Sequence, residues 1–287
     1  MFWGMVKSFG FSIMVATFNE EHVIYRYKYL PFSEGALKTL LDGTIKFTCP
    51  LDFNDPFDCL PYYDKYSIEQ YARSRPDLLK AAGDLRGLSP SQRLQQKGQF
   101  VARLRNRVAD GSFAADLLRR VGVVSLSRDA LSILMWSHYA DFHRGFVLEF
   151  RIPTMGTHED LRLSTSRLLP FPVEYSAERP HIKIGTELPR DLVPKIVLTK
   201  SLDWEYEAEE RVVDQERGAG IFTYSRDDIL CSVIAGMRMP SRDYEHLESI
   251  VVVLAKGAIP HLKLFRASAK RDEYRLEVAE HPRLAVV

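Results

Sequence analysis

The sequence predicts an α+β fold, with a core of mixed or antiparallel β-sheet and a helical insertion at about residues 64–120. Short runs rich in Val, Ile, Tyr and Phe recur along most of the chain, which is typical of strands. Residues 66–120 differ, because they are polar and rich in helix-forming residues. Apolar residues make up 46% of the 287 residues, enough for a substantial core, which excludes a mainly disordered, collagen-like or coiled-coil protein.

The chain opens with a segment, 1–23, that we expect to be poorly determined, and residues 24–287 are predicted to form a single domain. The run 24–30 alternates aromatic or aliphatic residues with basic ones, as a strand with one buried face does. A short helix is expected next, capped by Ser33, with Leu37, Leu40 and Leu41 on one face and an end at Gly43. A second short strand at 45–49 and a turn-rich loop at 51–61 follow.

The helical insertion is expected to start at caps on Ser67 and Ser89, with Pro90 in the first turn of the second helix. Residues 66–120 hold 11 Lys and Arg against 5 Asp and Glu, whereas the whole chain is nearly neutral, with 39 against 38. This local excess indicates either a solvated surface of a helical insertion or lid, or a surface that binds phosphate-bearing partners.

The remainder of the chain is expected to be mostly β-structure. Helical or mixed character is expected at 129–140, and one more helix near 242–249. The strands are expected at 121–127, 145–151, 171–175, 195–200, 210–214, 229–236, 250–255, 261–267 and 273–279.

Several classes of protein are unlikely on the sequence alone. The three cysteines, Cys49, Cys59 and Cys231, form no C-x-x-C pair, so we expect no disulfide framework, no zinc site and a reducing, cytoplasmic setting. The apolar N-terminal run is too short and too interrupted to span a membrane. The motifs of P-loop ATPases, Rossmann dehydrogenases, zincins and α/β-hydrolases do not occur.

Two candidate binding clusters lie in the first part of the chain. Tyr25, Arg26 and Tyr27 offer hydroxyl groups and a guanidinium fork for phosphate or carboxylate, although an amphipathic strand also explains them. Asn54 and Asp55 either bend a structural loop, or orient a ribose or hold a cation.

Two further clusters lie in the second part. Trp136, His138, Tyr139 and His143 offer flat surfaces for a nucleobase or nicotinamide ring and groups for proton transfer, and they favour an organic ligand over a metal. If their segment is extended, Glu207 and Glu209 project from the same face. Two carboxylates that close together either belong to a catalytic site or form part of an exposed acidic turn.

Three stretches of the chain resemble successive blocks of a bacterial family called domain of unknown function 2971. The blocks lie between about residues 24 and 213, and residues 66–120 fall in the variable stretch of that family. NDPFD and MWSHYADFHRGF are the most specific motifs, and the family name implies no activity. The blocks are LPFSEGALKTLLDGTIKFTCPLDFNDPFDC, VVSLSRDALSILMWSHYADFHRGFVLEF and TKSLDWEYEAEERVV.

The chain also resembles ADP-ribosyltransferases of the arginine-serine-glutamate type, which carry an Arg on an early strand, S-x-S on a middle strand and E-x-E near a late strand. The resemblance implies that Arg26 binds the NAD phosphates or the adjacent ribose. Ser125 and Ser127 would then shape the nicotinamide pocket. Glu209 would be the catalytic carboxylate and Glu207 would orient the acceptor.

These observations lead to three functional hypotheses. The first is an ADP-ribosyltransferase or NAD glycohydrolase that uses NAD as substrate, modifies a nucleic-acid or protein acceptor, and serves as a toxin or in phage defence. The second is a nucleic-acid-binding module or nuclease that uses the basic helices. The third is a nucleotide sensor without catalysis.

Overall fold

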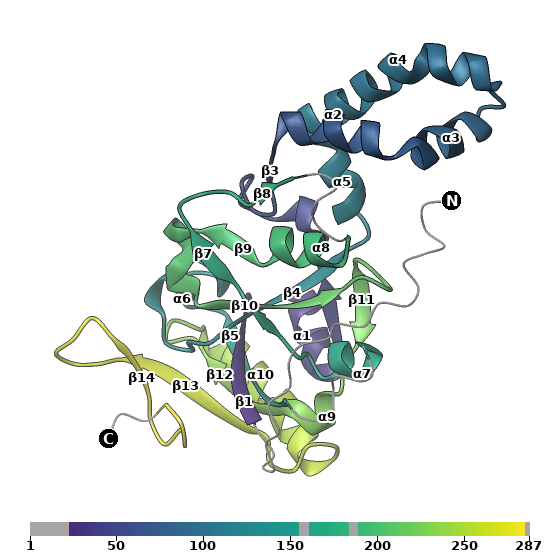
Figure 1. Ribbon diagram of the computed structural model, residues 1–287. Coiled ribbons are helices and arrows are strands. Elements are labelled where there is room, and N and C mark those ends of the chain that lie inside the picture. Colours follow the sequence, from purple (N-terminus) through teal and green to yellow (C-terminus); the bar gives the residue numbers. More distant parts are fainter. Residues whose placement is uncertain (1–22, 155–160, 184–188, 285–287) are drawn as a thin grey trace. The chain divides into compact units, whose positions relative to one another are not determined.

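The computed structural model describes residues 23–154, 161–183 and 189–284, and the predicted N-terminal segment 1–23 lies almost wholly outside these ranges (Figure 1). The chain divides into two compact units. Unit 1 comprises Met1–Thr48, Gly122–Val173 and Asp203–Val287. Unit 2 comprises Cys49–Val121 and Glu174–Leu202. The helical insertion therefore shares its unit with the later stretch Glu174–Leu202.

Unit 1 contains an eight-stranded sheet with the order β14-β13-β12-β5-β1-β4-β10-β6. Neighbouring strands are antiparallel except β12 and β13, which run parallel, so the sheet is mixed and the predicted α+β class is confirmed. The strands are β1 (Val23–Leu30), β4 (Gly122–Ser127), β5 (Phe146–Pro153), β6 (Phe171–Pro172), β10 (Glu209–Asp214), β12 (Leu230–Ala235), β13 (Lys263–Ala269) and β14 (Leu276–Val278).

The pairing of β1 differs on its two sides. With β5 it forms eight successive pairs, from Val23 opposite Pro153 to Leu30 opposite Phe146. With β4 it pairs only at Tyr27 opposite Ser127. The sheet is therefore continuous from β12 to β1 and joined to β4 and β10 at one register position.

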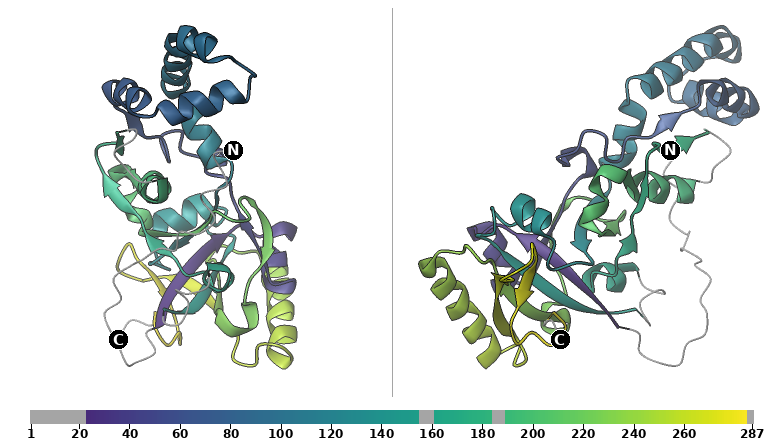
Figure 2. Two further views of the ribbon diagram at one scale, coloured as in Figure 1. Left: turned by 45° about the vertical axis from the view of Figure 1, so that its right-hand side comes forward. Right: turned by 90° about the vertical axis from the view of Figure 1, so that its left-hand side faces the viewer.

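The sheet of unit 1 has a hydrophobic cluster on each face. One cluster contains Leu148, Phe150 and Val124 of the sheet together with buried residues of α1 (Glu34–Leu41) and α10 (Ser241–Lys256), and Figure 2 shows α10, in yellow-green, beside the sheet. The other contains alternate sheet residues, among them Tyr27, and is covered by α6 (Ile133–Tyr139). Alternating side chains of each strand thus enter different cores.

The remaining elements of unit 1 are short. Strands β2 and β11 form a separate antiparallel pair, and η2 leads into β10. These elements are β2 (Thr44–Phe47), α7 (Leu161–Ser166), η2 (Leu202–Glu207), β11 (Gly220–Thr223) and α9 (Arg226–Ile229).

Unit 2 holds the predicted helical insertion, which is confirmed as four successive helices between Lys65 and Leu118. They are α2 (Lys65–Ser74), α3 (Pro76–Asp84), α4 (Pro90–Ala109) and α5 (Ser112–Leu118). The other elements of unit 2 are η1 (Pro50–Asp52), β3 (Tyr62–Tyr63), β7 (Glu174–Ser176), β8 (His181–Ile182), α8 (Pro189–Val197) and β9 (Thr199–Ser201).

Two predicted helix caps are confirmed and one is wrong. Ser33 caps α1, and Ser89 caps α4 in a reciprocal capping box with Gln92. Helix α2 starts earlier than expected, because the carboxylate of Asp64 accepts from the backbone N–H of Tyr66, while the Ser67 hydroxyl donates to the Asp64 carbonyl.

Three other expectations about elements are wrong. The apolar run 250–255 is not a strand, because it continues α10 and buries Ile250, Val251 and Leu254 at helical spacing. The run 195–200 divides between α8 and β9. Leu41 is 47% exposed, although Leu37 and Leu40 are buried as expected.

Among the described residues, no helix is both long enough and apolar enough to cross a membrane.

Candidate functional site

The S-x-S and E-x-E motifs meet in unit 1 because β4 and β10 are neighbouring strands. Ser127 lies opposite Tyr27 on one side and opposite Glu209 on the other, so the three residues form one row across the sheet. Residues directly opposite in antiparallel strands point to the same face. This row therefore places the second serine of S-x-S and the second glutamate of E-x-E side by side.

Ser127 also holds the backbone just before β10. Its hydroxyl donates to the carbonyl of Glu207 at 2.7 Å and accepts from the backbone N–H of Asp129 at 3.0 Å. Ser127 is 1% exposed, so these bonds lie away from water. The predicted association of Ser127 with the two glutamates is thus present in the structure.

Ser125, the first serine of the motif, is half-buried and lies opposite Arg211. Its carbonyl accepts from the ammonium group of Lys28 at 2.9 Å. Burial lowers the pKa of Lys28 to about 8, and the negative charge of Glu209 limits the shift. Lys28 therefore provides a group that titrates near neutral pH beside the motif, and the sequence analysis did not select it.

Glu207 and Glu209 do not share one face of an extended segment, contrary to the prediction. Glu207 ends η2 and Glu209 begins β10. Ala208 between them has a φ of 45°, in the left-handed region that residues other than glycine rarely adopt. This change of backbone conformation separates the directions of the two carboxylates. Such strain persists only where the surroundings impose it, and it is frequent at functional sites.

The two carboxylates have different surroundings, and both residues are buried, with 3% and 4% exposure. The hydroxyl of Tyr139 donates to Oε1 of Glu207 at 2.6 Å. Arg211 donates to both oxygens of Glu209, from Nε and from Nη2, at 2.9 Å each. Arg211 itself is completely buried, so Glu209 and Arg211 form a paired charge inside the protein.

A group of aromatic rings includes Tyr139, the hydrogen-bond donor to Glu207. The exposed ring of His138 lies 6.3 Å from Tyr139 and 6.2 Å from Tyr206, and Trp204 lies 6.0 Å from Tyr206. Tyr139, Trp204 and Tyr206 are all half-buried. We call Ser127, His138, Tyr139, Tyr206 and Glu207 the Glu207 cluster. Of its aromatic members, the sequence analysis selected His138 and Tyr139 and missed Tyr206, although Tyr206 directly precedes Glu207.

Arg26 does not join this cluster. It lies on the opposite face from Tyr27 and forms a two-point ion pair with Glu210, with Nε–Oε2 at 2.5 Å and Nη2–Oε1 at 2.7 Å. Its third nitrogen donates to the carbonyl of Tyr25 at 2.7 Å. The guanidinium fork is thus occupied by the protein, which does not favour the predicted contact with NAD phosphates.

Trp136 does not offer the expected stacking surface. It is fully buried, its ring N–H donates to the carbonyl of Ala130 at 2.8 Å, and Tyr29 packs edge-on against it at 5.5 Å. The ring of His143 is nearly parallel to that of Trp136, with 6.2 Å between the ring centres, and His143 Nε2 lies 3.1 Å from the Ser137 hydroxyl. Burial and the nearby positive charge of Arg238 lower the pKa of His143.

The segment after α6 is a tight structural corner. Asp141, Phe142 and His143 all have positive φ. A Cβ at Gly145 would lie 2.1 Å from the carbonyl oxygen of Leu30, so only glycine fits there. Packing therefore explains Trp136, His143 and Gly145 in the MWSHYADFHRG motif, while His138 and Tyr139 belong to the Glu207 cluster.

The remaining predicted residues lie elsewhere. Asn54 and Asp55 belong to unit 2, where the Asp55 carboxylate accepts from the backbone N–H of Phe57 at 2.9 Å, as expected for a structural turn. In the same loop, Asp58 lies 3.9 Å from the buried ammonium group of Lys200. We therefore do not include Asn54 and Asp55 in the site of unit 1.

Tyr25 and Tyr27 contact a second buried carboxylate, Glu149, and its partners. The Tyr27 hydroxyl donates to Glu149 at 3.3 Å, and the ring of Tyr25 lies 4.0 Å from the guanidinium of Arg283. Arg283 binds both oxygens of Glu149, at 2.8 and 2.6 Å, and Ser232 donates at 2.6 Å. The sequence analysis missed this group.

The Glu149 carboxylate is held in its ionised form. Burial opposes ionisation, but hydrogen bonds from His281, Arg283 and Ser232 outweigh it and lower the pKa of Glu149 to about 2. We call Glu149, Ser232, His281 and Arg283 the Glu149 network. It ties the last described residues of the chain to the centre of the sheet.

No group of three or more His, Cys, Asp or Glu that would suit a metal ion occurs among the residues that the structure describes.

Comparison with known proteins gives one match. The model of a family described as protein of unknown function (DUF2971) matches residues 135–212, a stretch that includes Tyr139, Glu207 and Glu209. No curated protein and no solved structure matches the chain. The match over this stretch supports the resemblance to the DUF2971 family that the sequence blocks predicted.

Proposed function

We propose that this protein cleaves the bond between nicotinamide and ribose in NAD, as an ADP-ribosyltransferase or NAD glycohydrolase. The observation that supports this most is the meeting of the two motifs. Ser127 lies opposite Glu209 in the sheet, and its hydroxyl holds the carbonyl of Glu207. Two carboxylates, a serine and a group of aromatic rings are thereby brought together from distant parts of the chain.

The chemistry of this bond suits a fixed carboxylate. As the bond from C1′ to the nicotinamide nitrogen breaks, its electron pair leaves with neutral nicotinamide and positive charge develops on the ribose. A buried carboxylate near that ring stabilises the charge as it forms. Water or an acceptor group then attacks C1′ and releases a proton, which completes hydrolysis or ADP-ribosyl transfer.

The Glu207 cluster supplies groups for each part of this reaction. Tyr139 orients the Glu207 carboxylate through the 2.6 Å hydrogen bond, and the rings of Tyr206 and His138 are flat surfaces suited to nicotinamide. Glu209 and its partner Arg211 provide a second carboxylate next to Ser127. In this proposal either a nucleic acid or a protein serves as acceptor.

The proposal departs from the resemblance to ADP-ribosyltransferases in two respects, namely Arg26 and the catalytic carboxylate, which is Glu207 here instead of Glu209. The ion pair of Arg26 with Glu210 gives it a structural role between β1 and β10, so we assign it no contact with NAD. The proposal retains Ser127, Glu207 and Glu209 as site residues and adds Tyr206.

The test is release of nicotinamide from NAD by the purified protein, measured by chromatography. Glu207→Gln preserves the shape of the side chain and removes its charge, so we expect turnover to fall by about 100- to 1000-fold. The matched control is Glu205→Gln, because Glu205 lies two residues away in the same segment and is exposed. Circular dichroism and thermal unfolding check that each variant is folded.

The outcomes separate the competing functions. Full turnover in Glu207→Gln, or equal loss in Glu205→Gln, contradicts the assignment of Glu207. Wild-type protein that neither binds nor consumes NAD contradicts the whole proposal. Binding of NAD without turnover indicates a nucleotide sensor.

A further inference from the structure

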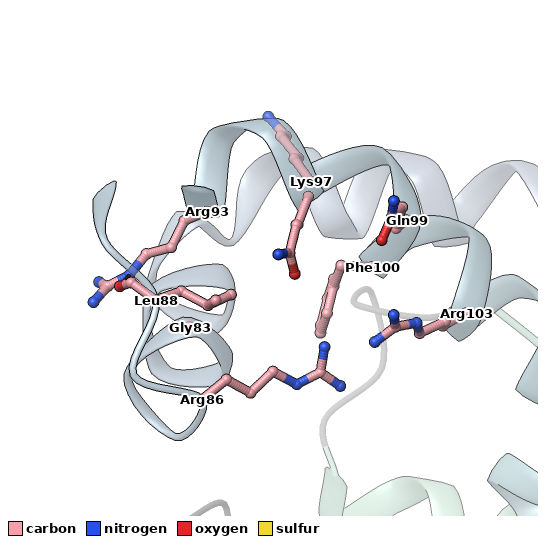
Figure 3. Close-up of a pocket in the computed structure, with 9 residues that line it drawn as sticks. Gly83, Arg86, Leu88, Arg93, Lys97, Gln99, Phe100 and Arg103 are labelled. Carbon is pink, nitrogen blue, oxygen red and sulfur yellow. Dashed lines mark hydrogen bonds between the residues drawn. The ribbon is translucent and has the colours of Figure 1, made fainter. Parts of the chain in front are cut away.

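Unit 2 carries a cationic hollow of its own, between the end of α3 and the middle of α4. We call it the α4 hollow (Figure 3). Its lining includes Arg86, Arg93, Lys97, Phe100 and Arg103. Lys97, Phe100 and Arg103 recur every three residues and so lie along one side of α4. Arg86 comes from the turn that follows α3.

The turn that shapes the hollow is well defined by hydrogen bonds. The backbone N–H of Leu88 donates to the carbonyl of Gly83 at 2.9 Å, and Gly87 has a φ of 64°. Ser89 and Gln92 then cap α4, with Pro90 in its first turn. A Cβ at Gly83 would lie 2.7 Å from the side chain of Arg93, so glycine lets that side chain pack across α3.

The four cations of the hollow fall into two kinds. Arg93 is structural, because it donates to the carbonyl of Leu88 at 2.7 Å and to the carboxylate of Asp84 at 2.6 Å. Arg86, Lys97 and Arg103 form no ion pair with any residue in the described part of the chain. Three positive charges thus converge on one hollow without a negative partner there, and an anionic ligand would lower their mutual repulsion.

An aromatic ring lies among these cations. Phe100 is half-buried, and Figure 3 shows the guanidinium groups of Arg86 and Arg103 extending toward its ring. The amide side chains of Gln96 and Gln99 line the same hollow. Cations that bind phosphates, together with a ring on which a base stacks, are typical of surfaces that bind single-stranded nucleic acid.

We propose that the α4 hollow binds single-stranded nucleic acid, with Arg86, Lys97 and Arg103 on the backbone phosphates and an unpaired base against Phe100. Double-stranded nucleic acid fits less well, because its bases are stacked and cannot reach the ring. This inference rests on residues of unit 2 alone and does not depend on NAD cleavage.

The first test measures binding of a fluorescent single-stranded oligonucleotide by anisotropy over a range of salt concentrations. The triple variant Arg86→Gln, Lys97→Gln, Arg103→Gln should bind more weakly, and the slope of log affinity against log salt should become less steep by about 2, since each lost phosphate contact contributes about 0.7. The control Arg242→Gln, Lys256→Gln, Arg271→Gln removes the same charge from exposed positions of unit 1 and should retain both affinity and slope.

The second test isolates the ring. Phe100→Leu keeps an apolar side chain for packing and removes the stacking surface, so we expect about tenfold weaker binding with an unchanged salt slope. Phe100→Trp, which keeps a stacking surface, should bind the oligonucleotide at least as tightly as the wild type.

Several outcomes would overturn the inference. These are absence of binding by the wild type, equal losses in the triple variant and its control, and equal affinity for a duplex of the same sequence. Competition by a free nucleoside monophosphate as strong as that of the oligonucleotide would indicate a small-molecule site instead.

Discussion

Two glutamates of unit 1, Glu149 and Glu207, are almost equally buried, but their carboxylates have very different hydrogen-bond partners. They are 0% and 3% exposed. Glu149 lies in the middle of β5 and is bound by Arg283, Ser232 and Tyr27 from three other parts of the chain. Glu207 is the last residue of η2, next to Ala208 with its left-handed backbone, and its carboxylate accepts a hydrogen bond from the neutral hydroxyl of Tyr139.

The comparison indicates that burial does not by itself identify a functional carboxylate. The partners of Glu149 include a guanidinium that binds both of its oxygens, and they join the centre of the sheet to residues near the end of the chain. The group of rings beside Glu207 includes half-buried Tyr139 and Tyr206 and the exposed ring of His138. We therefore interpret the Glu149 network as structural and the Glu207 cluster as the site.

The largest difference in stability is expected between Glu149→Gln and Glu207→Gln. Glu149→Gln leaves Arg283 without its buried carboxylate and should lower the free energy of unfolding by about 3 kcal/mol or more. Glu207→Gln should cost less, because the Tyr139 hydroxyl can also donate to the amide oxygen of glutamine. Urea unfolding of both variants measures this difference, and equal losses would contradict the division into a structural and a functional glutamate.

The pH dependence of stability tests whether the network holds Glu149 in its ionised form. The pKa of Glu149 falls from 4.5 to about 2 on folding, so its ionised form stabilises the folded protein above pH 5. That contribution, roughly 3 kcal/mol, is lost as the pH falls from about 5 to about 2. Glu149→Gln should therefore flatten the acid limb of the stability profile, measured by urea unfolding at a series of pH values. An unchanged acid limb in Glu149→Gln would show that other carboxylates determine it.

The sequence predicted best the elements that have a clear pattern of apolar and polar residues or clear helix caps. The alternation at 24–30 identified β1, and the polar, capped stretch identified the four helices of unit 2. The run 250–255 was misassigned because six consecutive apolar residues have no period of their own. The helical spacing appears only when Leu247 is considered with Ile250, Val251 and Leu254.

The residues of the candidate site were predicted only in part, because the register of strand pairing cannot be inferred from the sequence. Chain order associated Ser127 with Glu209, and the sheet brings them together. The face on which Arg26 lies depends on the pairing of Tyr27 with Ser127, which no local pattern indicates. The Glu149 network was missed because its partners, Ser232, His281 and Arg283, lie far from Glu149 in the sequence.

The smallest effects are expected from removing one tyrosine hydroxyl beside each glutamate. Tyr139→Phe deletes the donor to Glu207, and Tyr27→Phe deletes a donor to Glu149. Each should lower the free energy of unfolding by about 1 kcal/mol, the usual value of one hydrogen bond. Only Tyr139→Phe should also slow release of nicotinamide from NAD, by about tenfold, because the Glu207 carboxylate then loses its fixed orientation. If both variants slow release equally, the row from Glu149 through Tyr27 to Ser127 acts as one unit with the site, and the distinction between the two glutamates fails.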